Sequence, residues 1–215
     1  MKLQTAIDRV NVETAAAIIR DLQGVTDFVE IGTSLIKEYG LERSVSILSN
    51  QFPDIAFLAD IKTCDEAAYE FEKCYEAGAY MATCMGFASD ASLQACSQTA
   101  ANWQRDWMID LMELPDDRIR SLAHAYPDAV FGIHLSFDNH GLGLQELIVR
   151  STSVIREAEA ADGHRRRIAA AGGITPSLLP DLKKCGMDTV IVGSAITKAS
   201  NIREAAKVFF EACRQ

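Results

Sequence analysis

Basic residues are scarce in this sequence, and their scarcity sets the first limit on its function. Lysine and arginine together number 21 against 30 aspartates and glutamates, so the formal net charge is −9. Nucleic acids and anionic membranes are bound through a basic face, so this balance argues against both as partners. An anionic substrate stays possible where a lysine, a metal ion or helix N-termini supply positive potential locally.

Long apolar runs and paired cysteine motifs are missing as well. No run approaches the ~18 residues of a membrane span, and residues 1–8 lack the apolar centre of a signal peptide. The six cysteines form no CxxC pair and no Cys/His spacing typical of zinc, a pattern of reduced thiols in the cytosol. We therefore expect a soluble, cytoplasmic protein.

No linker rich in Pro, Gly or Ser divides the chain, so we expect one domain over residues 1–215. Short apolar runs alternate with segments of helical spacing, which is typical of a parallel sheet. The runs are residues 3–7, 28–31, 55–59, 80–84, 107–111, 130–134, 168–170 and 189–192. Eight such units predict the α/β class and a single (β/α)₈ TIM barrel. A doubly wound open sheet is the alternative, but the chain has no GxGxxG after the first strand and no Walker sequence.

Charged residues directly follow the apolar run 55–59. Asp60 and Lys62 are two residues apart, so a regular strand would point both side chains to one side. Asp65 follows where a turn or helix start is expected. Charges at the end of a buried run are costly to desolvate unless they are paired, metal-bound or catalytic. Two interpretations stay open: a structural ion pair with Asp65 capping the next helix, or a catalytic site.

Other polar residues stand where the predicted strands end, and barrel enzymes work at the C-terminal ends of their strands. The set is Asp8, Glu30, Asp60, Lys62, Asp110, His134, the pair Gly172-Gly173 and the pair Gly193-Ser194. Taken singly, each has a structural explanation, such as a turn, an ion pair or a core histidine. Six ionisable groups at one end of a barrel are hard to explain by packing, so together they predict an active site.

The last two strands end in glycine turns. Ala171-Gly172-Gly173 leads to Thr175 and Pro176, a plausible helix start, and Gly193-Ser194 ends the eighth strand. Loops after strands seven and eight form the usual phosphate site of this fold, because glycine lets backbone N–H groups approach an anion. The alternative is that these glycines only make the turns.

A basic cluster at residues 164–167, His-Arg-Arg-Arg, precedes the seventh strand. It should therefore lie at the N-terminal end of the barrel, away from the predicted site. We expect a solvated surface run there.

The motif Asp60-x-Lys62-x-x-Asp65, with Glu30-Ile31-Gly32-Thr33 before it, resembles the orotidine-monophosphate-decarboxylase-like barrels. Within that group the chain is most similar to the family of 3-hexulose-6-phosphate synthase and 3-keto-L-gulonate-6-phosphate decarboxylase. The similarity runs the full length of the chain and includes His134 and both glycine turns.

The resemblance implies a homodimer with active sites at the subunit interface. In it, Glu30 and Asp60 hold Mg²⁺, Lys62 stands beside the substrate oxygens, Asp65 reaches into the partner's site, and His134 moves protons. The chemistry shared by the family is a Mg²⁺-stabilised cis-enediolate, which suits carboxylates and a hard cation. Histidine has a reference pKa of about 6.5, near working pH, as a general acid or base requires.

Three positions separate the two activities in the family. Decarboxylase-type members carry Glu, Arg and Thr where this chain has Asp110, Phe137 and Ala171. The resemblance therefore favours the aldol addition of formaldehyde to D-ribulose 5-phosphate, with His134 removing the C1 proton. The decarboxylase activity is the first alternative, and a barrel that binds a phosphosugar without turning it over is the second.

The chain also departs from the family pattern near the Asp65 loop and the sugar pocket. Glu66-Ala67 replaces two small residues, and Leu135-Ser136 replaces a small residue plus Gly. Ser194 stands where some relatives place a phosphate-binding Arg. The proposed metal pair and Lys62 are unaffected.

Overall fold

Eight parallel strands close into a barrel in chain order, with β1 paired to both β2 and β8. The computed structural model describes residues 1–136, 138 and 143–215 of the protein. The strands are β1 (Lys2–Ile7), β2 (Phe28–Ile31), β3 (Ala56–Thr63), β4 (Met81–Met85), β5 (Asp106–Asp110), β6 (Val130–His134), β7 (Arg167–Ala171) and β8 (Thr189–Val192). The predicted (β/α)₈ TIM barrel is confirmed, and the open-sheet alternative is wrong.

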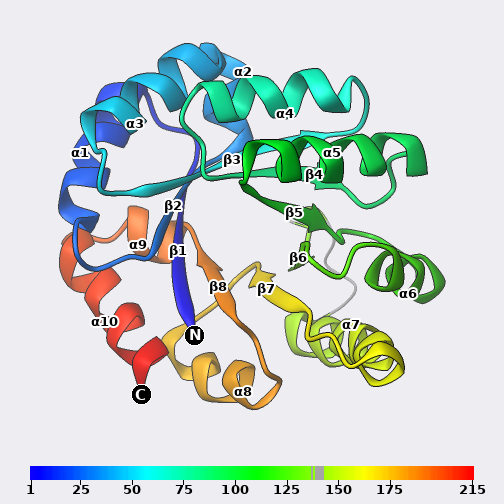
Figure 1. The fold of residues 1–215 in the computed structure, drawn as a ribbon. Coiled ribbons are helices and arrows are strands. Elements are labelled where there is room, and N and C mark those ends of the chain that lie inside the picture. The colour runs from blue at the N-terminus through cyan, green and yellow to red at the C-terminus, as the bar shows by residue number, and fades with distance from the viewer. Residues whose placement is uncertain (137, 139–142) are drawn as a thin grey trace.

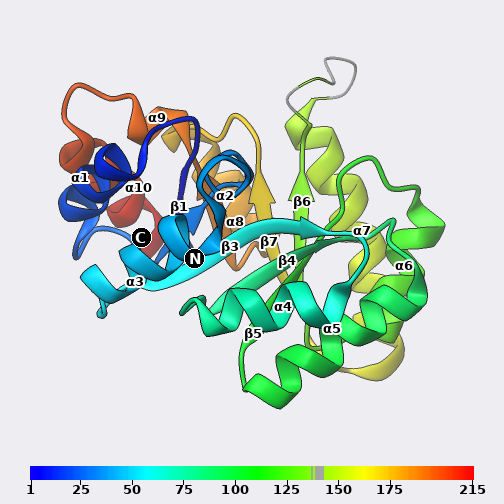
Figure 2. The same ribbon diagram turned by 90° about the horizontal axis from the view of Figure 1, so that it is seen from above.

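Helices follow the strands and lie outside them (Figure 1). They are α1 (Val12–Leu22), α2 (Thr33–Leu41), η1 (Glu42–Ser46), α3 (Ile47–Gln51), α4 (Ala67–Glu76), α5 (Asp90–Trp103), α6 (Asp116–Ala125), α7 (Leu144–Asp162), η2 (Pro176–Leu178), α8 (Leu179–Lys184), α9 (Ser194–Thr197) and α10 (Ile202–Arg214). Figure 2 shows β6 and β7 side by side and pointing the same way, as their parallel pairing requires. All strands therefore end on the same side of the molecule.

The strand positions follow from burial on both faces. Apolar side chains fill the space between the strands and the surrounding helices in one large cluster. A separate small cluster fills the barrel interior, as side chains do in this fold, and consists of Leu58, Met81, Met108, Val130 and Ala169. Near-continuous apolar runs are what a strand buried on both faces needs, so the runs in the sequence located the strands well.

Strand β3 is longer than its apolar run. The run ends at Ala59, whereas the strand continues to Thr63 and carries Asp60 and Lys62 within it. Polar side chains in this extension fall at the C-terminal end of the barrel. Residues of neighbouring strands determine how the side chains of Asp60 and Lys62 are held.

The basic cluster before β7 is solvated at His164 and Arg165, as predicted, but the prediction is wrong at Arg166. That side chain is fully buried. Its Nε and Nη2 donate to the Ala123 carbonyl oxygen at 3.0 and 2.8 Å, and Nη1 and Nη2 bind the Asp162 carboxylate at 2.5 and 2.6 Å. Arg166 thus joins the ends of α6 and α7 to the start of β7. A buried guanidinium needs such partners, and one of them, the Ala123 carbonyl, lies 43 residues away, where the local sequence does not show it.

All six cysteines are free thiols. Burial raises the pKa of the Cys74 thiol to about 12, which keeps it protonated and unreactive. Across residues 1–136, 138 and 143–215, no helix has the length and apolar character needed to cross a membrane.

Candidate active site

The C-terminal ends of four strands bring five ionisable side chains together. Glu30 comes from β2, Asp60 and Lys62 from β3, Asp110 from β5 and His134 from β6. Lys62 Nζ lies 2.6 Å from Asp110 Oδ2 and 3.3 Å from Asp60 Oδ1. The ammonium therefore bridges carboxylates from two strands.

A bulge in β3 aims Lys62 at this cluster. Ala59 pairs with Ala82, but Thr63 pairs with Cys84, so β3 advances four residues while β4 advances two. Lys62 lies in the bulge with a φ of 53°, in the left-handed region. A residue with a Cβ pays about 1–2 kcal/mol for this conformation. The side chains of Asp60 and Lys62 do meet, but the regular period of two expected from the sequence is not the reason.

Asp110 is the shared partner of the two basic side chains. Its Oδ2 accepts hydrogen bonds from Lys62 Nζ at 2.6 Å and from His134 Nδ1 at 2.9 Å, and its Oδ1 accepts from the backbone N–H of Met112 at 2.9 Å. Burial raises the pKa of Asp110, but His134 and Lys62 outweigh it, so the net shift is downward and the group is a carboxylate. Since Nδ1 of His134 is occupied, its Nε2 is the nitrogen left for a substrate.

The same contacts act on Lys62. Burial lowers the pKa of its ammonium, but the nearby charges of Asp60 and Asp110 raise it further, so the net shift is upward. Lys62 is therefore a fixed positive charge and not a base.

Asp60 and Glu30 are both buried and held by polar neighbours. Asp60 accepts from Thr83 Oγ1 on Oδ1 and from Thr33 Oγ1 on Oδ2, both at 2.8 Å. Glu30 accepts from Gln4 Nε2 at 2.5 Å. Burial and the charge of Asp60 raise the pKa of Glu30 to about 8, against the lowering effect of Gln4. The positive charge near Glu30 and Asp60 is therefore too small to keep both of these buried carboxyl groups ionised at neutral pH.

The composition of this site fits a hard divalent cation. Glu30, Asp60 and Asp110 are each less than a tenth exposed; Lys62 pairs with Asp60 and Asp110, and His134 binds Asp110 as well. Within the described chain, no three His, Cys, Asp or Glu side chains are grouped to hold a metal ion. A cation here would have Glu30 and Asp60 as two oxygen ligands, with water or substrate completing the coordination, as is common for Mg²⁺.

Asp65 does not join the cluster of its own chain. Its side chain is exposed, and in the part of the chain that the structure describes it makes no hydrogen bond or ion pair. The interpretation of Asp65 as a helix cap is wrong, because α4 has Glu66 at its N-cap and no side-chain cap there. Glu66 has a φ of 49°, in the left-handed region that favours glycine over a residue with a Cβ.

Asp8, at the end of β1, is also engaged outside the cluster. Its Oδ1 accepts from Ser34 Oγ at 2.7 Å, at the first turn of α2. The carboxylate packs on Gly32, where an added Cβ would lie 2.2 Å from its atoms. Only glycine at position 32 permits this approach.

The two glycine turns lie next to each other because β7 and β8 pair. Gly172 and Gly173 have φ values of 110° and 63°, and a Cβ on Gly172 would lie 2.9 Å from Leu135 Cβ. Ala171 is in register with His134. Gly193 precedes α9, which begins at Ser194. Backbone groups of both turns are thus close to the strand ends that carry the charged cluster.

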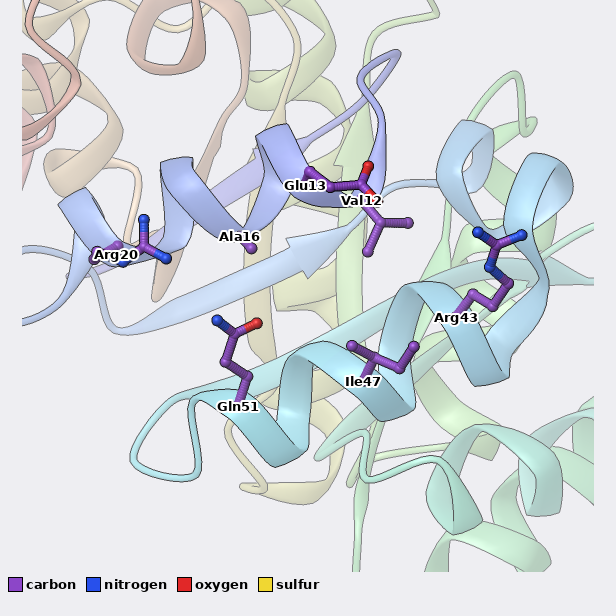
Figure 3. Close-up of a pocket in the computed structure, with 7 residues that line it drawn as sticks. All are labelled: Val12, Glu13, Ala16, Arg20, Arg43, Ile47 and Gln51. Carbon is purple, nitrogen blue, oxygen red and sulfur yellow. The ribbon is translucent and has the colours of Figure 1, made fainter.

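A cavity of about 290 Å³ lies beside His134. Glu113, Leu135, Leu147 and Arg150 line it with His134. A larger cavity of about 350 Å³ lies between α1 and the η1–α3 segment and contains none of the clustered residues (Figure 3). We place the active site at the charged cluster, since chemistry depends on the groups present and not on cavity size.

Three supporting residues were missed in the sequence: Gln4, Thr33 and Thr83. Gln4 and Thr83 interrupt the apolar runs of β1 and β4, and both are buried. A polar side chain inside a buried run must find a partner, so this interruption was the available signal.

The family is assigned from a match that covers nearly the whole chain. A family model described as orotidine 5′-phosphate decarboxylase / HUMPS family matches residues 1–209. The chain belongs to this family.

Several named proteins and solved structures of this family are similar to the chain. A protein of Staphylococcus aureus (strain USA300) named 3-hexulose-6-phosphate synthase is 33% identical over 211 residues, 96% of each chain. A crystal structure of 3-hexulose-6-phosphate synthase from Salmonella typhimurium has a TM-score of 0.89 at 27% identity, covering 100% of this chain and 99% of that one. KGPDC from Streptococcus mutans has a TM-score of 0.84 at 21% identity, covering 99% and 97%, and shows the shared fold.

Two of the three positions that we expect to separate the activities lie in the described structure. Asp110 is the buried bridge between Lys62 and His134, and Ala171 is the last residue of β7. Phe137 lies outside the described residues.

Proposed function

We propose that this protein is a 3-hexulose-6-phosphate synthase, which adds formaldehyde to D-ribulose 5-phosphate. The observation that carries the proposal is the single oxygen of Asp110 that binds both Lys62 Nζ and His134 Nδ1. Aldol addition begins by removing a carbon-bound proton, which needs an oriented base beside a fixed positive charge. The names of the relatives at 33% and 27% identity support the same reaction.

The site residues have distinct roles in this reaction. Nε2 of His134 removes the C1 proton of the sugar, and the electron pair moves into a C1–C2 enediolate. Asp110 fixes the imidazole and stabilises its protonated form, as a carboxylate does for a general base. C1 then forms a bond to the formaldehyde carbon, and the aldehyde oxygen takes the proton back from His134. Lys62 holds its charge beside the sugar oxygens throughout.

Mg²⁺ held by Glu30 and Asp60 would supply further positive charge for the developing oxyanion. The glycine turns after β7 and β8 would bind the phosphate through backbone N–H groups, with Gly172, Gly173, Gly193 and Ser194 as the contacts and Ala171 beside the sugar. Asp8, at the end of β1, stands at the edge of this site.

The direct test is to assay the unmodified protein with ribulose 5-phosphate plus formaldehyde, and separately with 3-keto-L-gulonate 6-phosphate. We expect the larger kcat/KM for the first pair. A larger value for the keto acid would assign the decarboxylase activity instead. Binding of both sugars without turnover would assign a non-catalytic phosphosugar-binding barrel.

The proposed Mg²⁺ site predicts that folding stability and Mg²⁺ affinity depend on pH. The pKa of Glu30 is about 8 in the folded protein and 4.5 as its reference value. Between pH 4.5 and pH 8, Glu30 therefore keeps its proton in the metal-free folded state, whereas the unfolded chain releases it. The contribution of Glu30 to stability therefore falls as pH rises from 4.5 to 8. Mg²⁺ needs the carboxylate, so below pH 8 its binding must displace the proton, and its affinity should fall by up to about tenfold per pH unit.

Thermal unfolding with and without Mg²⁺ measures this effect. We expect a larger Mg²⁺-induced rise in Tm at pH 8.5 than at pH 6.5, and no rise in excess EDTA. Glu30→Gln is the matched control, because it keeps the side-chain shape and removes the titration. Equal Mg²⁺ stabilisation of the unmodified protein at both pH values would contradict the role of Glu30.

We further propose a homodimer with shared active sites. The support is Asp65, an exposed carboxylate with no partner in the described residues of its own chain, three residues after the central lysine. A two-fold dimer would allow each Asp65 to enter the partner's site. The free thiols support a cytoplasmic location.

A further inference from the structure

The backbone of Lys62 is in the left-handed region, so other contacts must stabilise this conformation. The bulge in β3 interrupts the pairing with β4 between Ala59 and Thr63, so the strand ladder does not hold this residue. Without another contact, the backbone could relax toward a regular strand and move the ammonium away from Asp110.

One hydroxyl from β4 supplies the missing contact. Thr83 Oγ1 accepts a hydrogen bond from the backbone N–H of Lys62 at 3.0 Å and donates its proton to Asp60 Oδ1 at 2.8 Å. The carboxylate cannot donate and the amide cannot accept, so the hydroxyl direction is fixed. Thr83 is buried, which excludes water as a competing partner.

We propose that Thr83 is a positioning residue that locks the bulge of β3 and aligns Lys62 and Asp60 for the reaction. It acts on the backbone of Lys62 and on the Asp60 oxygen that lies 3.3 Å from Lys62 Nζ. Its hydroxyl thus couples the direction of the lysine to the orientation of the carboxylate. The kinetic part of this inference rests on the proposed function, whereas the structural part does not.

The contact with Asp60 differs from that of Thr33. Thr33 Oγ1 binds Asp60 through Oδ2 and through the backbone carbonyl, and in the described structure it makes no hydrogen bond to Lys62. Loss of the Thr33 hydroxyl should affect Asp60 and not the backbone N–H of Lys62. Loss of the Thr83 hydroxyl should affect both the carboxylate and the lysine backbone.

The variants Thr83→Val and Thr83→Ser test this directly. Valine keeps the shape without the hydroxyl, and serine keeps the hydroxyl without the methyl group. Thr33→Val separates the two contacts on Asp60. Thr152→Val is the matched control, because Thr152 is a buried threonine of α7 whose Oγ1 has no hydrogen-bond partner in the described structure.

Amide hydrogen exchange of Lys62 by NMR and Mg²⁺ binding by calorimetry are measured without substrate. In Thr83→Val we expect Lys62 to lose its amide protection locally, with Mg²⁺ affinity and kcat/KM each about 10- to 100-fold lower. Thr83→Ser should restore all three, Thr33→Val should keep the Lys62 protection, and Thr152→Val should match the unmodified protein.

Retained Lys62 protection in Thr83→Val would overturn the proposal, as would a serine variant as impaired as the valine one. Equal loss of protection along the whole of β4 would show a general packing role and also overturn it. If Thr83→Val does not fold, Thr83→Ser against Thr83→Cys gives the same contrast between a hydroxyl and a weak thiol donor. Since exchange and metal binding need no turnover, these results stand even if the proposed reaction is wrong.

Discussion

Replacing Asp110 with asparagine is expected to lower kcat by about 10³-fold while leaving the fold intact. An amide of the same size has no charge and only one accepting oxygen, so it cannot accept from Lys62, His134 and the Met112 N–H together, as the two carboxylate oxygens do. If the amide NH₂ faces His134, Nδ1 must accept, and the proton then sits on Nε2, which is the wrong tautomer for a base. Steady-state kinetics with ribulose 5-phosphate and formaldehyde measure the loss.

The matched control is Asp106→Asn, the same change at the opposite end of β5. Asp106 forms an ion pair with Arg167 at 2.8 Å and lies away from the charged cluster. Its substitution should leave kcat near the unmodified value. An Asp110→Asn variant with nearly full activity would show that the shared oxygen does not organise the base.

Mixing two inactive chains is expected to restore activity if the active sites are shared. Asp65→Ala and His134→Ala homodimers should each be inactive, because each site lacks one group. In a mixed dimer, one site combines His134 of the first chain with Asp65 of the partner subunit, and the other site lacks both. Mixed dimers purified through two different affinity tags should show about half the activity of the unmodified dimer, as two-fold symmetry requires.

The result separates a shared site from one built within a single subunit. If Asp65 acts within its own chain, both sites of the mixed dimer lack one group and the mixture stays inactive. If the two tags never purify together, the homodimer itself is refuted. Gel filtration of each single variant confirms that the substitutions leave assembly unchanged.

The origin of the fold in the sequence is clear in β2, β6 and β8. Their apolar runs at residues 28–31, 130–134 and 189–192 match the observed strands in full. Strands buried on both faces need such runs, and eight of them with helices between close a barrel. Parallel strands of a barrel end on one side, so chain order alone predicted that Glu30, Asp60, Asp110 and His134 gather there.

The contacts between strands could not be predicted from the sequence. The bulge that turns Lys62 depends on the register between β3 and β4, and the bridge made by Asp110 joins residues 48 and 24 positions away. Arg166 is buried because a carbonyl and a carboxylate from two helix ends meet it. Local pattern reports which face of an element is apolar, whereas the partner of a polar atom is set by strands and helices that only tertiary folding brings together. The sequence therefore determined which charged residues gather at the strand ends, whereas the tertiary structure decided how each of them is held and which neutral residues hold them.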